Sequence, residues 1–243
     1  TKYWIENFDI DGWRMDVAKE LGFSFWKDFR DIAYSAKEDV LLISEIFGDT
    51  SQWLQGDRFD GTMNYSFRET MTDYFATKRI NNKEFADSLA NLYSMYSFEA
   101  LSSCQNLLSS HDVKRFLNRS GNNEDGILGA IFLQTTFPGI AGIYYGDEIG
   151  LGGADDPFNR EPFPWHDQPS WNMTILEFTK TMMNIKNSNT IFKYGRFELL
   201  NDTEDVVIFR RILQDESLLC IVNRDRLTKD LTINTNAHSI DVI

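Results

Sequence analysis

The most constraining feature of this 243-residue sequence is an alternation of two apolar patterns that continues to about residue 190. Short apolar runs predict strands, and longer segments with apolar residues every three or four positions predict helices. The predicted strands lie at 12–17, 41–43, 61–65, 107–108 and 142–145, and the predicted helices at 25–36, 67–75, 85–96, 128–135 and 175–185. Strands that alternate with helices form parallel sheets, so an α/β fold is predicted here.

The pattern changes after Gly195. Apolar runs at 206–209, 218–222 and 231–233 are separated by short polar turns, which predicts a small antiparallel sheet. The chain begins at Thr1 inside a predicted helix and ends on the apolar segment 239–243 without a polar cap. We therefore expect both ends to be cuts in a longer protein, and the small sheet to be incomplete.

Composition excludes several classes of function. The formal net charge of −13 argues against nucleic acid as a partner, because phosphate binding needs a basic surface. No run is long and apolar enough to predict a membrane span, and no signal peptide is evident. Cys104 and Cys220 lie in apolar stretches, a pattern typical of buried thiols rather than of a disulfide or a metal site.

The strand predicted at 12–17 carries two charges, Arg14 and Asp16. A buried parallel strand is expected to be nearly all apolar. Residues two apart on a strand point to the same face, so these opposite charges are predicted to lie together. A functional site and a structural ion pair both explain this pattern, since buried charges are rare unless paired.

Polar residues follow the predicted strands at four places: Asp16, Glu45, His111 with Asp112, and Asp147 with Glu148. In a (β/α)8 barrel the active site lies at the carboxyl ends of the strands. Glu45 follows Asp16 by 29 residues, which fits one strand–helix unit, and Asp112 follows Glu45 by 67, which fits about two. The three carboxylates are therefore predicted to converge on one face.

Converging carboxylates suit glycoside hydrolysis, in which one ionised carboxylate attacks the anomeric carbon and a protonated one donates to the leaving oxygen. An adjacent arginine keeps the first ionised, as Arg14 is placed to do for Asp16. A flanking apolar strand raises the pKa of the second by desolvation, as the run 41–43 is placed to do for Glu45.

Other interpretations fit some of the same residues. Acidic residues at strand ends are often helix N-caps, and Asp49 and Asp147 fit that role. His111 with Asp112 fits a metal-binding pair, but the only other histidines, His166 and His238, lie in a predicted loop and in the C-terminal sheet. A metal site is therefore not predicted.

Three motifs, in order, resemble those of the α-amylase family of glycoside hydrolases: Asp9–Ala18 at its fourth barrel strand, Ile43–Phe47 at its fifth, and Ser110–Asp112 at its seventh. Within that family the chain is most similar to the cyclomaltodextrinase, neopullulanase and maltogenic amylase group. Residues 59–65, 110–116 and 143–150, with Asp156-Pro157 and Arg160 after the last of these, carry this closer similarity. Three positions differ on the acceptor side, where Phe47-Gly48 replaces the group's usual Trp-His and Lys19 its usual Asn.

The resemblance implies roles for seven residues. Asp16 is implied as the nucleophile, Glu45 as the general acid/base, and Asp112 as the carboxylate that stabilises the transition state. Arg14 orients and ionises the nucleophile, and His111 hydrogen-bonds the sugar. Asp156 and Arg160 match positions that contact the non-reducing side of the substrate. An ion pair that braces their loop explains these last two equally well.

The resemblance also implies a fold and an activity. Residues 1–192 are expected to form strands four to eight of a (β/α)8 barrel, and residues 193–243 an incomplete C-terminal β-sheet domain. The first three barrel strands are absent. The expected function is a retaining hydrolase of α-1,4-glucans, with a non-catalytic α-glucan-binding scaffold as the alternative.

Cofactors and partners follow from the same resemblance. No cofactor is expected, while calcium binding by the full-length parent stays open. We expect an α-glucan as the partner, without nucleic acid or membrane. We also expect self-association, or pairing with the missing N-terminal half. The compartment is left open, with the cytoplasm favoured over secretion or the periplasm.

Overall fold

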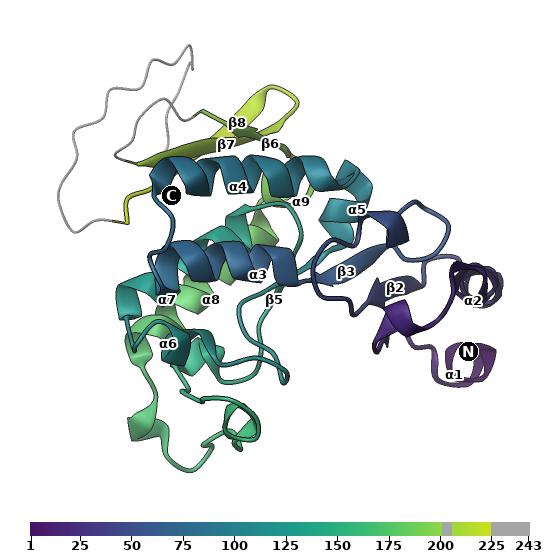
Figure 1. Ribbon diagram of the computed structural model, residues 1–243, viewed down its shortest axis with the longest axis horizontal. Helices are drawn as coiled ribbons and strands as arrows, with labels where there is room; N and C mark the ends of the chain where they lie inside the picture. The colour runs from purple at the N-terminus through teal and green to yellow at the C-terminus, as the bar shows by residue number, and fades with distance from the viewer. Residues whose placement is uncertain (201–205, 225–243) are drawn as a thin grey trace.

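The computed structural model describes residues 1–200 and 206–224, and it contains an open parallel sheet of five strands (Figure 1). These are β1 (Gly12–Met15), β2 (Leu41–Ser44), β3 (Gly61–Asn64), β4 (Gln105–Leu107) and β5 (Ile140–Gly142), hydrogen-bonded in that order. Each strand runs parallel to its neighbour in sequence. The predicted parallel sheet is confirmed, and β1 and β5 are its two edges.

Helices connect these strands, as the alternating pattern predicts. They are α1 (Lys2–Phe8), α2 (Phe23–Ala36), α3 (Tyr65–Met71), α4 (Asn82–Met95), α5 (Phe98–Ser103), α6 (Phe116–Arg119), α7 (Glu124–Thr136), α8 (Met173–Ser188) and α9 (Thr190–Tyr194). Local chemistry sets several ends. Asn81 and Glu84 form a reciprocal capping box at the start of α4. Pro138 and Gly139 follow the end of α7, because proline cannot continue a helix.

Strand β5 lies two residues earlier than the strand predicted at 142–145, so that prediction was displaced. The Ile140 amide donates to the Cys104 carbonyl at 2.8 Å as soon as the chain leaves α7. The apolar run that follows leaves the ladder, because the Tyr145 carbonyl accepts a 2.7 Å hydrogen bond from Arg115 Nη1 instead. Apolar composition alone therefore predicted strand for residues that a buried arginine holds in a loop.

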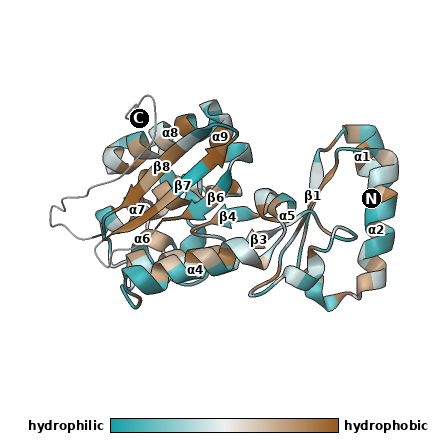
Figure 2. Ribbon diagram, turned by 90° about the horizontal axis from the view of Figure 1, so that it is seen from above, coloured by the Kyte–Doolittle hydropathy of each residue, from teal (hydrophilic) through white to brown (hydrophobic). Residues whose placement is uncertain are grey.

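Helix α2 covers the first strands through aromatic side chains. Trp26 packs on Phe59 with ring centroids 4.8 Å apart, and Phe29 packs on Trp13 of β1 at 6.3 Å. Both α1 and α2 lie beside β1 and β2, away from α7 and α8 (Figure 2). The outer face of α1 stays exposed: Tyr3, Trp4 and Phe8 are each about half exposed and contact one another.

The small antiparallel sheet is confirmed for the described residues and contains β6 (Arg196–Leu199), β7 (Val207–Leu213) and β8 (Glu216–Val222). Strand β6 was not predicted, and the segments 231–233 and 239–243 lie outside the described residues. Arg211 of β7 is fully buried and donates to the Thr136 carbonyl at the end of α7 and to Gly195. This side chain joins the small sheet to the rest of the molecule.

Two further predictions concern the whole chain. Cys104 and Cys220 are buried and unbonded to each other, and burial raises the pKa of each thiol to about 12. The prediction of buried thiols is therefore confirmed. Within the described residues, no helix combines the length and the apolar character that crossing a membrane requires.

Candidate active site

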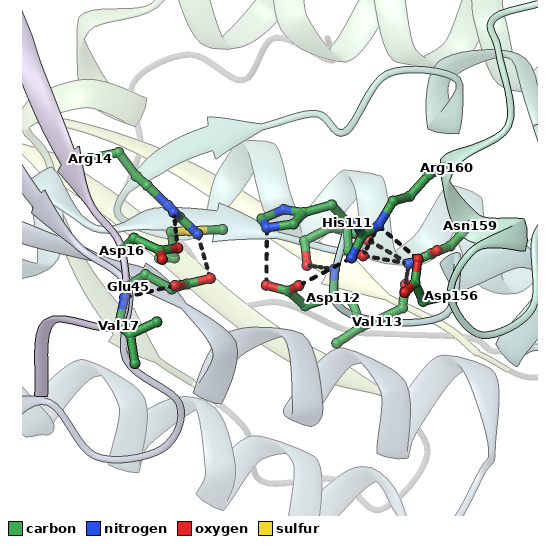
Figure 3. Close-up of polar contacts among 12 residues, drawn as sticks. Arg14, Asp16, Val17, Glu45, His111, Asp112, Val113, Asp156, Asn159 and Arg160 are labelled. Carbon is green, nitrogen blue, oxygen red and sulfur yellow. Dashed lines mark hydrogen bonds and ion pairs between the residues drawn. The ribbon is translucent and has the colours of Figure 1, made fainter. Parts of the chain in front are cut away.

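A cavity of about 340 Å³ lies at the carboxyl ends of β1, β2 and β4. Its lining is Asp16, Val17, Lys19, Glu45, Ile46, Phe47, His111 and Asp112. The carboxyl ends of parallel strands meet at one edge of a sheet, so residues far apart in sequence gather there. The predicted convergence of the three carboxylates on one face is what the structure shows (Figure 3).

One guanidinium holds two of these carboxylates. Arg14 Nη1 contacts Asp16 Oδ1 at 2.6 Å, while Nη2 forms an ion pair with Glu45 Oε1 (Figure 3). Its Nε lies 3.4 Å from Met63 Sδ. The pairing of Arg14 with Asp16 therefore matches the prediction from their two-residue spacing, with Asp16 one residue past the end of β1. The two carboxylates are also brought close together, because they occupy adjacent amino groups of a single planar group.

The two carboxylates have opposite environments. The side chain of Asp16 is 72% exposed and that of Glu45 is 6% exposed. The hydrogen bond from Arg14 lowers the pKa of Asp16 below its usual range. Burial raises the pKa of Glu45, although the Val17 amide and Arg14 both oppose that shift. One carboxyl is therefore poised to be ionised and the other to carry a proton, as the neighbouring residues predict.

The backbone at Val17 is strained. Its φ of 44° places a β-branched residue in the left-handed region, which normally favours glycine. In this conformation the Val17 amide donates to Glu45 Oε2 at 3.0 Å. Strained backbone of this kind often accompanies functional sites. The sequence did not predict it, because valine gives no signal of a positive φ.

The turn after β4 supplies His111 and Asp112. His111 Nε2 lies 3.1 Å from Asp112 Oδ2, and the Asp112 amide donates to Ser110 Oγ at 3.2 Å. Ser110 Oγ in turn lies 3.1 Å from the Tyr65 hydroxyl. The half-exposed Phe47 ring stacks on Tyr65 with centroids 3.8 Å apart, which gives the cavity one flat apolar wall.

Asp156 and Arg160 lie on the far side of Asp112 from Glu45 and do not line the cavity (Figure 3). Arg160 Nε contacts Asp156 Oδ1 at 3.0 Å and donates to the His111 carbonyl at 2.9 Å. Arg160 Nη2 lies 3.7 Å from Asp112 Oδ1. Both residues are therefore tied to the His111–Asp112 turn, and Arg160 reaches the carboxylate itself.

Asp147 and Glu148 do not line the cavity and lie in the short 3-10 helix Asp147–Ile149. Arg115 is fully buried and lies 3.2 Å from Asp147 Oδ1, and burial raises the pKa of Asp147 to about 6. The helix-cap interpretation of Asp147 was wrong, since Gly146 occupies the N-cap of that short turn. A buried guanidinium needs a counter-charge, and Asp147 supplies it. Glu148 accepts from the Gly146 amide at 2.7 Å, outside the cavity. Asp49 is not an N-cap either, because Thr50 occupies the N-cap of the short turn Ser51–Trp53, although Asp49 does accept from the Ser51 amide at 2.8 Å.

Among the described residues, one group of potential metal ligands stands close enough to share an ion: Glu45, His111 and Asp112, whose ligand atoms lie within 4.8 Å of one another. Calcium prefers six to eight oxygen ligands. This group offers two carboxylates and a nitrogen, and both oxygens of Glu45 are already held by Arg14 and the Val17 amide. The group therefore does not fit calcium.

Sequence reasoning missed three contributions to the site. Lys19 and Phe47 line the cavity, and the sequence marked them only as departures from the family pattern. Asn159 is fully buried and bonds to the turn that carries His111. Its place between Asp156 and Arg160 in the same motif was the one signal that pointed to it.

Comparisons with known proteins agree with this geometry. The model of the α-amylase catalytic domain matches residues 1–196. A cyclomaltodextrinase from Thermoanaerobacter pseudethanolicus is 34% identical over 243 residues, which is 100% of this chain and 42% of that protein. An intracellular maltogenic amylase from Bacillus subtilis is 38% identical over 238 residues, which is 95% of this chain and 40% of that protein.

A solved structure agrees as well. The ligand-free cyclic α-maltosyl-(1→6)-maltose hydrolase from Arthrobacter globiformis superposes with a TM-score of 0.87 at 32% identity, over 91% of this chain and 50% of that one. The chain thus spans less than half of the two curated relatives and half of this solved chain.

Proposed function

The chain belongs to the α-amylase family of glycoside hydrolases, and from that premise we propose that the full-length protein hydrolyses α-1,4-glucans with retention of configuration. The substrates proposed are maltodextrins, cyclodextrins, pullulan or starch. One observation carries the proposal: a single guanidinium, that of Arg14, holds an exposed carboxylate with a lowered pKa beside a buried carboxyl with a raised one. Retaining glycosidases need such a pair about 5 Å apart.

The chemistry follows from these environments. Asp16 attacks the anomeric carbon while Glu45 protonates the oxygen of the departing sugar, so the glycosidic bond breaks as a glycosyl–Asp16 ester forms. Glu45 then takes a proton from water, which hydrolyses the ester and restores both carboxyl groups. Asp112 and His111 bind sugar hydroxyls, and Arg14 keeps Asp16 ionised and oriented.

Asp156 and Arg160 are proposed to contact the non-reducing side of the substrate. Their 3.0 Å ion pair also braces the loop, so the two roles are combined in one contact. The alternative function, a non-catalytic glucan-binding scaffold, is not favoured. The relatives are named as hydrolysing enzymes, and an inactive scaffold has no physical need for the environments of Asp16 and Glu45.

We infer that the five parallel strands are strands four to eight of a (β/α)8 barrel. Residues 1–192 then form the C-terminal part of the barrel, and 193–243 form a β-sheet domain. Two observations support this inference: the sheet is open at β1 and β5, and the chain spans 42% of the cyclomaltodextrinase it resembles. A complementary N-terminal half is the partner proposed for these edges. The cytoplasm is the compartment proposed, because one relative is named as intracellular.

The proposed activity is tested by incubating the full-length protein with maltotriose, a cyclodextrin, pullulan and starch. The anomeric configuration of the first product is followed by NMR. Cleavage with an α-anomeric product supports the proposal. Binding of maltotriose without cleavage would favour the scaffold instead, and a β-anomeric product would exclude Asp16 as nucleophile.

The rate of hydrolysis is expected to be bell-shaped in pH. Asp16 must be ionised, so activity is lost as pH falls through its lowered pKa. Glu45 must be protonated for the first step, so activity is lost as pH rises through its raised pKa. The acidic limb should therefore lie below the usual range of aspartate and the basic limb above that of glutamate. A kcat/KM profile over pH measures both limbs, and a basic limb within the ordinary glutamate range would contradict the assignment.

A polypeptide that contains only residues 1–243 is expected to self-associate. Open sheet edges recruit other chains, and β1 and β5 are both open. The exposed aromatic cluster of Tyr3, Trp4 and Phe8 adds apolar surface near β1. Sedimentation at micromolar concentration measures the mass. A stable monomer would mean that these edges need no cover, and the half-barrel inference would require revision.

A further inference from the structure

One buried amide bonds to the turn that carries His111 and Asp112. Asn159 Nδ2 donates to the carbonyl oxygens of Ser110, His111 and Val113 at 3.3, 2.8 and 3.0 Å (Figure 3). Its side chain is fully buried, and its Oδ1 has no hydrogen-bond partner among the described residues. All the hydrogen bonds that this side chain makes among the described residues are therefore donated to the turn.

Further contacts hold the Asn159 loop against the same turn. The Arg115 amide donates to the Gly153 carbonyl at 3.1 Å. A Cβ on Gly153 would lie 2.6 Å from the Phe158 carbonyl oxygen and 2.9 Å from Asn159 Cα, so only glycine allows this approach. The loop is thus folded closely on itself at Gly153, and its backbone is tied to Arg115, just after the turn, on the same side as the Asn159 amide bonds.

We propose that Asn159 is a positioning residue, which sets the place of Asp112 and His111 relative to Asp16 and Glu45. The proposal rests on the function proposed above. Three carbonyl oxygens around one point need a donor with two hydrogens, and an amide is the short neutral side chain that provides it. Without that donor the buried carbonyl oxygens lack a hydrogen-bond partner, which costs free energy. The turn is then expected to shift toward a position in which they are paired. Asp112 sits at the middle of that turn.

The test compares Asn159→Asp and Asn159→Ala with the wild type in the full-length protein. Aspartate keeps the shape but presents oxygens to three carbonyl oxygens, while alanine removes the group. Circular dichroism measures the folded fraction, and kcat is calculated per folded molecule. We expect kcat on maltotriose to fall by about 10²-fold, because small displacements of positioned groups lower the rate by about that factor. KM should change less than kcat, because only the sugar contacts of His111 and Asp112 are disturbed and the others are intact. A purely structural role would lower the folded fraction and leave kcat unchanged.

Asn189→Asp is the matched control. The Asn189 amide also donates to a backbone carbonyl, that of Ile185 at 2.8 Å, but it lies at the end of α8 away from the cavity. It is expected to keep wild-type kcat and KM. Should Asn159→Asp fail to fold, Asn159→Ser, which retains one hydroxyl donor, takes its place in the same comparison.

Hydrogen exchange gives a second readout that needs no activity. The amides of Val113, Arg115 and Phe116 are hydrogen-bonded in and around the turn. In the Asn159 variants their exchange should accelerate by about tenfold or more, with the rest of the chain unchanged. Unchanged exchange with unchanged kcat would overturn the proposal, and so would faster exchange spread over the whole chain. A wild-type protein that cleaves no glucan would refute the proposed function separately.

Discussion

Replacing Glu45 by glutamine is expected to lower kcat by at least about 10³-fold while the affinity for glucan stays close to wild type, because general acid/base catalysis contributes roughly 10²–10⁴-fold. Glutamine has the shape of glutamate but cannot transfer a proton. Its one amide oxygen can accept from the Val17 amide, which bonds to Glu45 Oε2 at 3.0 Å in the wild type, or from Arg14, but not from both, while the side chains proposed to bind the sugar are unchanged. Binding contacts are thereby kept and the chemical step is lost.

A substrate with an activated leaving group sharpens this test. Dinitrophenolate departs from a dinitrophenyl glycoside without being protonated. The Glu45→Gln variant should therefore still form the glycosyl–enzyme intermediate from this substrate in a rapid burst. The steady rate should stay low, because Glu45 is also the base that activates water. Stopped-flow absorbance separates the two phases. Loss of the burst together with the steady rate would mean that the variant has lost positioning rather than proton transfer.

Glu148→Gln is the matched control for that experiment. Glu148 also accepts a backbone amide, that of Gly146 at 2.7 Å, and it also follows a strand, but it lies outside the cavity. Its replacement should leave kcat within a few-fold of wild type. If instead Glu45→Gln is the variant that stays within a few-fold, the assignment of Glu45 as acid/base is wrong.

A polypeptide limited to residues 1–243 is expected to show no measurable glycosidase activity. Asp16, Glu45 and Asp112 are all present, but the sheet that carries them is open beside β1. Positioning of the reacting groups supplies up to about 7–11 kcal/mol of barrier reduction in favourable cases. On the half-barrel inference one wall of the cavity is missing from this polypeptide, so a sugar is not held in the geometry of attack and most of that contribution is lost.

Reducing-sugar release by the purified polypeptide measures this expectation, with Asp16→Asn as the control for contaminating activity. Steady release that Asp16→Asn abolishes would show that the five-stranded half is sufficient. Addition of the complementary half of the full-length protein should restore turnover if the half-barrel inference holds. No gain of activity in a folded mixture would count against it.

Much of the site could be predicted because its elements are encoded locally. The two-residue spacing of Arg14 and Asp16 predicted a common face, and the structure pairs them at 2.6 Å with Asp16 one residue past the end of β1. The apolar run before Glu45 predicted a shielded carboxyl with a raised pKa, and burial does raise it. The start and end of a strand were harder to predict from the sequence. Strand β5 pairs with β4 from Ile140, and Arg115 bonds to Tyr145 beyond the end of β5, and local composition encodes neither contact.

The order of strands and helices, the parallel sheet, and the edge of that sheet at which the carboxylates gather could all be predicted from local patterns. Periodicity and residue type act over a few neighbouring positions, and those are the features they control. The bridge from Asp16 to Glu45 through Arg14, the Val17 amide directed toward Glu45, and the bonds of Asn159 to the His111–Asp112 turn depend instead on how the folded chain packs. These contacts join residues that are 28 to 48 positions apart in the sequence. The approach of such segments is set by the packing of the whole sheet and its helices.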